Sequence, residues 1–227
     1  MTIRSARLWH GLTAVVAIGA LVLPLVLIFQ GDRVLDDTSQ DSLPVRLGRF
    51  VSYFTIQSNL LVAITATQLA RDPLRDGTRW RVVRLAAMAG IFVTSVVHFL
   101  LLGPLLELEG ADWLADKLLH MVVPLLAVVG WLLFGPRPRI ERRELTWALV
   151  WPIAWLVWTL VVGAISGWYP YPFLDHREEL GLPGVVVSIA GITAFFVLVV
   201  WVARLVDQRM QPAPQAWDPY RGGTARA

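Results

Sequence analysis

The sequence predicts an all-α fold, namely a polytopic membrane protein built as a bundle of six transmembrane helices. Hydrophobic residues make up 56% of the 227 residues and charged residues only 16%, a composition typical of membrane proteins. The charges are also unevenly spread, because six stretches contain no Asp, Glu, Lys or Arg: 8–31, 50–70, 85–106, 118–136, 145–174 and 180–203. Each stretch has 19 residues or more, and about 20 are needed to cross a bilayer as a helix.

We expect one six-helix transmembrane domain, residues 1–207, followed by a disordered cytoplasmic tail, residues 208–227. The tail is rich in Pro, Gly and Arg, which favours disorder. The first apolar stretch is too long for a signal peptide and ends in bulky residues that make a poor cleavage site. The chain has no cysteine, which excludes disulfides, thiol catalysis and thiolate metal sites.

The distribution of charge predicts the orientation in the membrane. With six spans both termini lie on one side, which receives 15 of the 20 Lys and Arg residues, whereas the other side receives 11 of the 17 acidic residues. The positive-inside rule then places both termini in the cytoplasm and the segments 32–49, 107–117 and 175–179 outside. We expect a plasma-membrane protein whose arginines set topology and contact anionic lipid, so the positive charge does not indicate a nucleic-acid partner.

The first two helices differ in character. Helix 8–31 contains Pro24, which is expected to bend it, and we assign it no chemistry. In helix 50–70, Thr55, Ser58, Asn59 and Val62 fall on one face. Because polar groups in hydrocarbon need partners, this face should line the protein interior or a water-filled pocket. Thr55 would lie about 9 Å below the outer boundary, at 1.5 Å per residue.

Helix 85–106 carries polar residues near its outer end. Thr94, Ser95 and His98 share one face, and the helix is expected to stop at Gly103 and Pro104. His98 therefore lies at about the depth of Thr55.

Helix 118–136 contains an ionisable ring beside a proline. Asp116 and Lys117 precede His120 by four and three residues, so both side chains can reach the imidazole. Pro124 cannot donate to the carbonyl of His120 and should kink the helix there. An ionisable side chain inside a membrane helix indicates a functional site.

The last third of the chain is predicted to pack around the polar residues of the preceding helices and to cover them on the outer side. Helix 146–165 carries four tryptophans that suit packing or the membrane interface. The loop 167–184 is aromatic, proline-rich and external, and we expect it to fold over the outer mouth as a lid that includes Tyr171. Helix 184–203 is almost entirely apolar and is expected to be a structural wall.

Three helices bring candidate site residues to one depth. A threonine hydroxyl becomes a nucleophile when a base takes its proton, and a neutral histidine can do so, which suggests Thr55 and His120. Asn59 could donate to a developing oxyanion, and Asp116 could hold the His120 ring in the required tautomer. The alternatives are that Thr55 bonds its own i−4 carbonyl and that His98 is a hydrogen-bonded core residue.

Three short motifs add a resemblance. The segments F-T-I-Q-S-N at 54–59, H-M-V-V-P at 120–124 and Y-P-F-L at 171–174, with the order of six helices, resemble the androgen-induced integral membrane protein family, as a distant prokaryotic member. Family members are threonine hydrolases that cleave fatty acid esters of hydroxy fatty acids. The resemblance spans roughly residues 8–205 and implies that Thr55 is the nucleophile and His120 the base.

The leading hypothesis is therefore an integral membrane hydrolase of lipid esters that needs no cofactor and no metal, with membrane lipids and a lipid ester as its partners. The expected supporting residues are Asn59, Ser58, His98, Asp116 and Tyr171. One alternative is a haem-binding electron-transfer protein with His98 and His120 as axial ligands, and another is a non-enzymatic membrane scaffold. No P-loop, dinucleotide fingerprint, serine elbow or zinc motif is present.

Overall fold

The computed structural model describes residues 2–31 and 41–213, and these form helices joined by loops. The α-helices are α1 (Ile3–Gln30), α2 (Leu43–Ser52), α3 (Phe54–Arg71), α4 (Thr78–Val97), α5 (Gly110–Lys117), α6 (Val123–Phe134), α7 (Arg142–Ala148), α8 (Val150–Ser166) and α9 (Gly181–Arg209). Two π-helical turns, His98–Leu102 and Leu118–Val122, continue α4 and join α5 to α6. The described residues thus confirm the all-α class.

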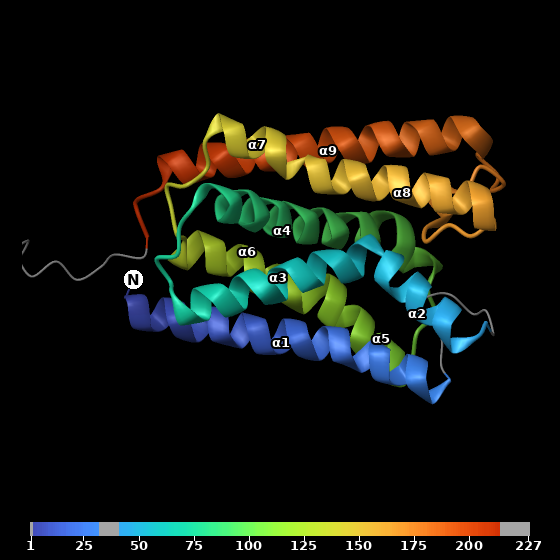
Figure 1. Cartoon of the computed structure of the whole chain (residues 1–227), viewed down its shortest axis with the longest axis horizontal. Helices are drawn as coiled ribbons and strands as arrows, with labels where there is room; N and C mark the ends of the chain where they lie inside the picture. Colours follow the sequence, from blue (N-terminus) through green and yellow to red (C-terminus); the bar gives the residue numbers. More distant parts are fainter. Residues whose placement is uncertain (1, 32–40, 214–227) are drawn as a thin grey trace, which may run out of the picture.

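Several helical segments are long and apolar enough to cross a membrane. Five such candidate spans are Ile3–Gln30, Thr78–Leu105, Gly110–Phe134, Arg142–Ser166 and Gly181–Arg209. The pair α2 and α3, bent by 69°, gives a sixth if it is one span. These spans run side by side along the long axis of the molecule (Figure 1). α8 and α9 lie on one side of α4, whereas α3 and α1 lie on its other side. This arrangement confirms the polytopic bundle.

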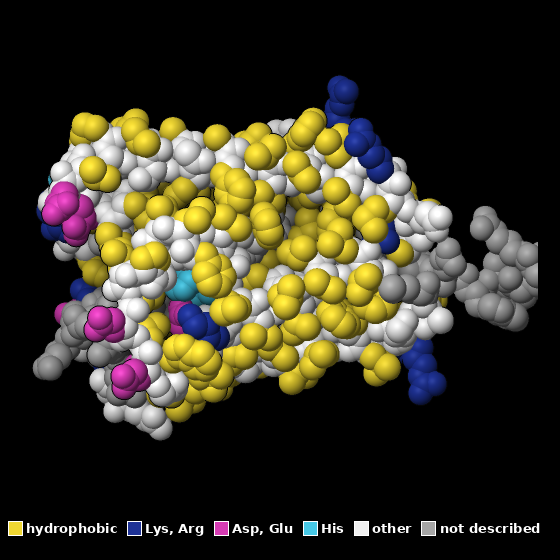
Figure 2. Space-filling view, turned by 180° about the vertical axis from the view of Figure 1, so that it is seen from behind, with side chains coloured by type: hydrophobic (Ala, Val, Ile, Leu, Met, Phe, Trp, Pro, Cys, Tyr) yellow, Lys and Arg dark blue, Asp and Glu magenta, His cyan; other side chains and the backbone are white. Residues whose placement is uncertain are grey.

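The surface of the bundle is apolar along its length and charged at its ends. Figure 2 shows hydrophobic side chains over the long face and acidic side chains gathered at one end. Large exposed hydrophobic residues are frequent on α1, α8 and α9, for example Val15, Val22, Ile153, Val157, Val187 and Leu198. Such a contiguous exposed apolar surface is expected of a protein that contacts lipid.

Several predicted boundaries are wrong because charged residues extend the helices. α4 begins at Thr78, so Arg79, Arg81 and Arg84 belong to a helix rather than to a loop. The span Gly110–Phe134 begins at Gly110. It includes Asp116, which we placed in an outer loop but which is buried in the bundle, with 5% of its surface exposed. Our prediction ended each helix at the first charged residue. A charged residue can nevertheless lie within a span when buried partners stabilise it.

The last helix and its contacts continue past residue 208, where we expected a tail to start. α9 continues to Arg209, the carbonyl of Gln211 accepts a hydrogen bond from Arg137 Nε at 2.9 Å, and Ala213 forms an isolated antiparallel bridge with Arg137. Residues 214–227 of the predicted tail, and residues 32–40 of the first predicted loop, lie outside the described part of the chain.

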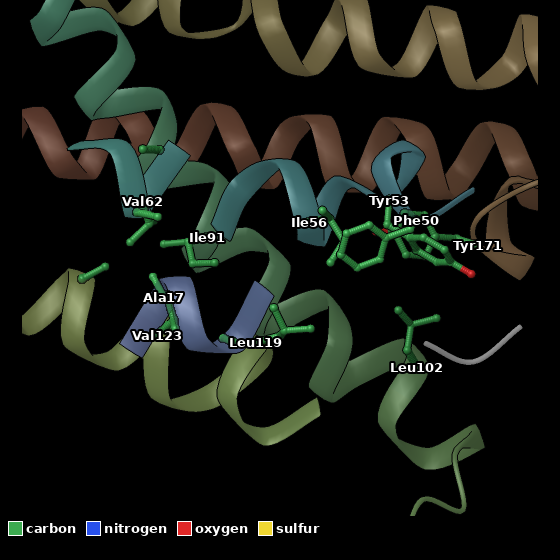
Figure 3. Close-up of a cluster of buried hydrophobic side chains, with 14 of the residues drawn as sticks. Ala17, Phe50, Tyr53, Ile56, Val62, Ile91, Leu102, Leu119, Val123 and Tyr171 are labelled. Atoms are coloured by element: carbon green, nitrogen blue, oxygen red, sulfur yellow. The ribbon is translucent and has the colours of Figure 1, made fainter. Parts of the chain in front are cut away.

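The core is built on a close contact between the first and third helices. A Cβ added at Gly11 of α1 would lie 3.9 Å from the Cβ of Ala70 on α3, and Ala17 and Ala20 are fully buried on the same helix. Small residues allow backbones to approach closely where lipid supplies no hydrophobic driving force between helices. The larger core residues, including Val62, Leu119 and Tyr171, fill the space between helices (Figure 3).

A sharp break between α2 and α3 interrupts the predicted second helix. We expected one continuous helix from residue 50, whereas Tyr53 is extended (φ −66°, ψ 131°) and the two helices meet at 69°. The broken backbone is satisfied by side chains. Gln57 Nε2 donates to the carbonyl of Val51 at 3.1 Å, and Trp155 Nε1 on α8 donates to that of Ser52 at 2.8 Å. Such compensation is what permits a broken helix at membrane depth.

Candidate active site

The helix break places Thr55 at the start of a helix, where its hydroxyl has no carbonyl of its own to bond. Thr13 and Thr65, inside helices, each donate to the carbonyl four residues earlier, at 2.9 and 2.8 Å. Thr55 is the second residue of α3, so its i−4 residue, Val51, belongs to the previous helix and is bonded by Gln57. The Thr55 hydroxyl is therefore directed to other helices rather than to its own backbone.

The Thr55 hydroxyl begins a chain of three functional groups. Its Oγ1 lies 3.3 Å from His120 Nε2, and His120 Nδ1 lies 2.9 Å from Asp116 Oδ1. An ionised carboxylate only accepts hydrogen bonds, so the Nδ1 that faces Asp116 carries the hydrogen and Nε2 presents its lone pair to Thr55. This is the tautomer that a general base requires, and the predicted reach of Asp116 to His120 is confirmed.

A distorted helix positions the His120 ring. Leu118–Val122 is a π-helical turn immediately before Pro124, a feature that often marks functional sites. Pro124 has no N–H to offer the carbonyl of His120, and Ser95 Oγ on α4 donates to that carbonyl instead, at 2.7 Å. At the predicted kink the backbone is thus π-helical, and a residue of the polar face predicted on the neighbouring helix bonds the carbonyl that Pro124 cannot.

Asp116 is the centre of a buried cluster. Its Oδ1 also lies 3.1 Å from His98 Nε2, and its Oδ2 accepts from Lys117 Nζ at 2.8 Å. The rings of His98 and His120 stack, with centroids 3.7 Å apart and planes at 7°. His98 therefore packs as a core residue, as the alternative interpretation proposed, but it packs against the ring of His120 and shares the Asp116 carboxylate with it.

The loop before α9 contributes a second hydroxyl. Tyr171 OH lies 3.3 Å from Thr55 Oγ1 and accepts from the Thr55 backbone N–H at 3.2 Å. The phenol ring stacks on Phe173 at 5.2 Å and meets the edge of Tyr53 at 5.7 Å. Arg177 holds the outer part of the loop by bonding Asp175 and the carbonyl of Gly167, and its guanidinium lowers the pKa of the Asp175 carboxyl.

Two predicted supporting residues, Asn59 and Ser58, join helices and do not contact the Thr55 hydroxyl or the His120 ring. Asn59 was expected to donate to an oxyanion, but its Nδ2 donates to the carbonyls of Thr55 at 2.9 Å and Leu119 at 3.3 Å. Both amide hydrogens are therefore used, and Asn59 ties α3 to the π-helical turn. Ser58 accepts from Thr94 Oγ1 at 3.3 Å and ties α3 to α4. Both side chains are fully buried, so the predicted polar face does point inward.

Two cavities meet at Thr55 and Tyr171. The larger, of about 860 Å³, lies between α3, α4, α8 and α9 and is almost entirely apolar, with Val93, Pro152 and Phe196 among its walls. The smaller, of about 530 Å³, is lined by the polar cluster, namely Thr55, His98, Asp116, His120 and Tyr171, with Pro24 of α1. Thr55 thus separates an apolar compartment from a polar one.

The same cluster offers three possible metal ligands, because atoms of His98, Asp116 and His120 lie within 4.8 Å of one another. One nitrogen of each stacked ring lies within hydrogen-bond distance of Asp116 Oδ1, at 3.1 and 2.9 Å, so in this arrangement the three groups bond one another. Axial ligation of a haem needs the two nitrogens to face each other across the iron. Here both face one carboxylate oxygen, and this geometry does not fit the haem alternative.

The helix break and Tyr171's contact with Thr55 are the features that sequence reasoning missed. A signal for the earlier helix exists, because Ser42 followed by Leu43 and Pro44 marks a helix start before the one predicted at residue 50. Tyr171 was placed in a lid, but no local pattern indicates that its hydroxyl reaches α3.

Comparison with protein-family models, with curated proteins and with solved structures gives no match to this chain.

Proposed function

We propose that this protein is an integral membrane hydrolase of lipid esters, with Thr55 as the nucleophile and His120 as the general base. The observation that carries the proposal is the chain of contacts from Thr55 Oγ1 to His120 Nε2 and from His120 Nδ1 to Asp116. It has the roles of a nucleophile, a base and a group that orients the base. The threonine-hydrolase family that the short motifs resemble uses the same two residue types.

The first step forms an acyl-enzyme. Thr55 Oγ1 attacks the ester carbonyl while His120 Nε2 takes its proton, and the Asp116 carboxylate stabilises the imidazolium that results. The carbonyl oxygen becomes an oxyanion, for which the Tyr171 hydroxyl and the Thr55 backbone N–H are the nearest donors. This N–H lies in the first turn of a helix, where it has no intrahelical partner, and it donates to Tyr171 when no substrate is bound. Collapse of the intermediate breaks the ester C–O bond, and the leaving alcohol receives the proton from His120.

The second step releases the acid. A water in the polar cavity attacks the carbonyl of acyl-Thr55, giving its proton to His120 Nε2. The acyl C–O bond breaks, the fatty acid leaves, and Thr55 Oγ1 regains a proton from His120. No cofactor takes part in either step.

The two cavities suit the two halves of a lipid ester. An acyl chain would occupy the apolar cavity, whose walls come from four helices and which Thr55 borders. The alcohol portion and the water would occupy the polar cavity around His120. The substrate would enter from the bilayer between α8 and α9, because both helices expose apolar surface there. A fatty acid ester of a hydroxy fatty acid is one such substrate.

A long-chain fluorophosphonate should modify Thr55, since phosphonylation mimics the first step and its alkyl chain can enter the apolar cavity. Purified protein is incubated with hexadecyl or ethyl fluorophosphonate, and intact and peptide masses are measured. We expect one adduct, mapped to Thr55 and formed faster with the hexadecyl probe. Thr55→Ala is the unlabelled control.

Labelling at another hydroxyl, or equal labelling of the Thr55→Ala variant, would contradict the proposal. A protein that resists the probe and hydrolyses no lipid ester would instead fit the scaffold alternative.

We further propose that the protein resides in the plasma membrane with both termini in the cytoplasm, as the charge distribution indicates. The chain has no cysteine, so single cysteines can report topology directly. Glu178→Cys, in the exposed loop before α9, should react with an impermeant maleimide in whole cells. Arg75→Cys and Arg142→Cys, exposed at the opposite end, should react only after lysis. The reverse pattern would place the site in the inner leaflet.

A further inference from the structure

A buried arginine lies at the end of the bundle opposite Thr55. Arg84 is the seventh residue of α4 and is 7% exposed. Its Nη1 lies 3.5 Å from Thr65 Oγ1, which is a weak contact to a neutral group. Its Nε and Nη2 have no hydrogen-bond partner among the described residues. These two nitrogens lie on the same edge of the guanidinium, and that edge forms the two-pronged fork that binds phosphate or carboxylate.

The charge of Arg84 is not offset by its surroundings. None of the ion pairs formed by the described residues involves it. Thr65 cannot neutralise it, because this hydroxyl is neutral and already donates to the carbonyl of Leu61. A buried, unpaired charge costs several kcal/mol, by rough estimate. A partner anion is therefore expected.

A cavity beside Arg84 offers room for that anion. It has a volume of about 290 Å³, and Arg81 and Arg139 line it together with Trp80 and Trp131. Arg81 and Arg139 share one carboxylate, that of Asp76, at 2.6 and 2.7 Å. The Arg81 guanidinium holds the pKa of this carboxyl well below its usual range, so Asp76 stays ionised. Together with the Glu141 carboxylate, 3.3 Å from Arg81 Nη1, it balances those two arginines. Arg84 alone, at the inner wall, keeps an uncompensated charge.

We propose that this cavity is a phosphate-binding site in which the side-on edge of Arg84 holds two phosphate oxygens. The cavity lies at the arginine-rich end of the bundle, beside tryptophans of the kind that favour the membrane interface. A phospholipid headgroup can reach it from the adjoining leaflet and a free phosphate from the aqueous side, so the shared chemistry is the phosphate group. The site is distinct from the Thr55 cluster and does not depend on the proposed hydrolase activity.

Thermal unfolding of delipidated protein in uncharged detergent tests this site. Phosphatidylglycerol should raise the melting temperature of the wild-type protein, because a ligand bound to the folded state stabilises it, whereas diacylglycerol, which lacks phosphate, should not. An equal rise with inorganic phosphate would identify a free-anion site, and a rise with the lipid alone a headgroup site. Arg79→Gln is the matched control, since Arg79 is an exposed residue of the same helix.

Arg84→Gln should lose the response and reduce phosphatidylglycerol retained in native mass spectra by about tenfold or more, as expected for two charge-assisted hydrogen bonds. Arg84→Lys, which keeps the charge but loses the fork, should retain less lipid than the wild type. In the delipidated state Arg84→Gln should melt no lower than the wild type, because it removes an unpaired buried charge. A full response in Arg84→Gln, an equal effect of diacylglycerol, or failure of Arg84→Gln to fold without lipid would overturn the proposal.

Discussion

Replacing Thr55 or His120 by alanine is expected to lower ester hydrolysis by about 10³-fold or more, and the double variant should be little worse than either single one. The reason is that a nucleophile and its base act as a unit, so removing one leaves little for the other to contribute. The measurement is kcat/KM for octanoyl and palmitoyl esters in detergent. Thr55→Ser should keep part of the activity, because its hydroxyl remains beside His120 Nε2.

Controls separate chemistry from folding in this experiment. Thr67→Ala is the matched threonine, since Thr67 lies on the same helix and donates to its own i−4 carbonyl, of Ala63, at 2.7 Å. It should keep wild-type activity. Loss of a buried hydrogen bond can itself destabilise by about 1 to 3 kcal/mol, so each variant must show a cooperative melt. A folded Thr55→Ala protein with undiminished turnover would refute the threonine mechanism.

The helices and the contact between Asp116 and His120 could be predicted because both depend on local patterns. Apolar length identifies a span, and the i, i+4 spacing of Asp116 and His120 fixes their contact whatever the rest of the fold does. The shared depth of Thr55 and His120 followed from the position of each residue within its own span. Their separation of 3.3 Å agrees with that prediction.

The remaining features depend on contacts between distant segments. The break at Tyr53 is stabilised by Trp155, which lies 103 residues from the Ser52 carbonyl it bonds, and Tyr171 reaches Thr55 across 116 residues. Asn59 illustrates the opposite error. It is one turn from Thr55, as an oxyanion donor would be, but a π-helical carbonyl of another helix takes its second hydrogen. Spacing along a helix therefore indicates which side chains can come close together, but it does not indicate which of several possible hydrogen-bond partners a side chain takes.

Asp116→Asn is expected to lower kcat by about 10² to 10³-fold with a smaller change in KM. The His120 tautomer should survive, because its Nδ1–H also lies 3.1 Å from the backbone carbonyl of Asp116. What disappears is the negative charge that stabilises the imidazolium in the transition state. The expected fall in kcat corresponds to a loss of about 3 to 4 kcal/mol of transition-state stabilisation, since each 1.4 kcal/mol is a factor of ten in rate.

The matched comparison for Asp116→Asn is His98→Ala, which removes another neighbour of the same carboxylate but leaves the contact between His120 and Asp116 in place. This variant should lose less activity than Asp116→Asn, since the charge facing His120 remains. Hexadecyl fluorophosphonate labelling gives a second readout, because it reports the first chemical step alone, and its rate should fall in the same order. If folded Asp116→Asn keeps turnover within a factor of about ten of the wild type, the buried carboxylate serves the fold of the three-residue cluster and His120 acts without it.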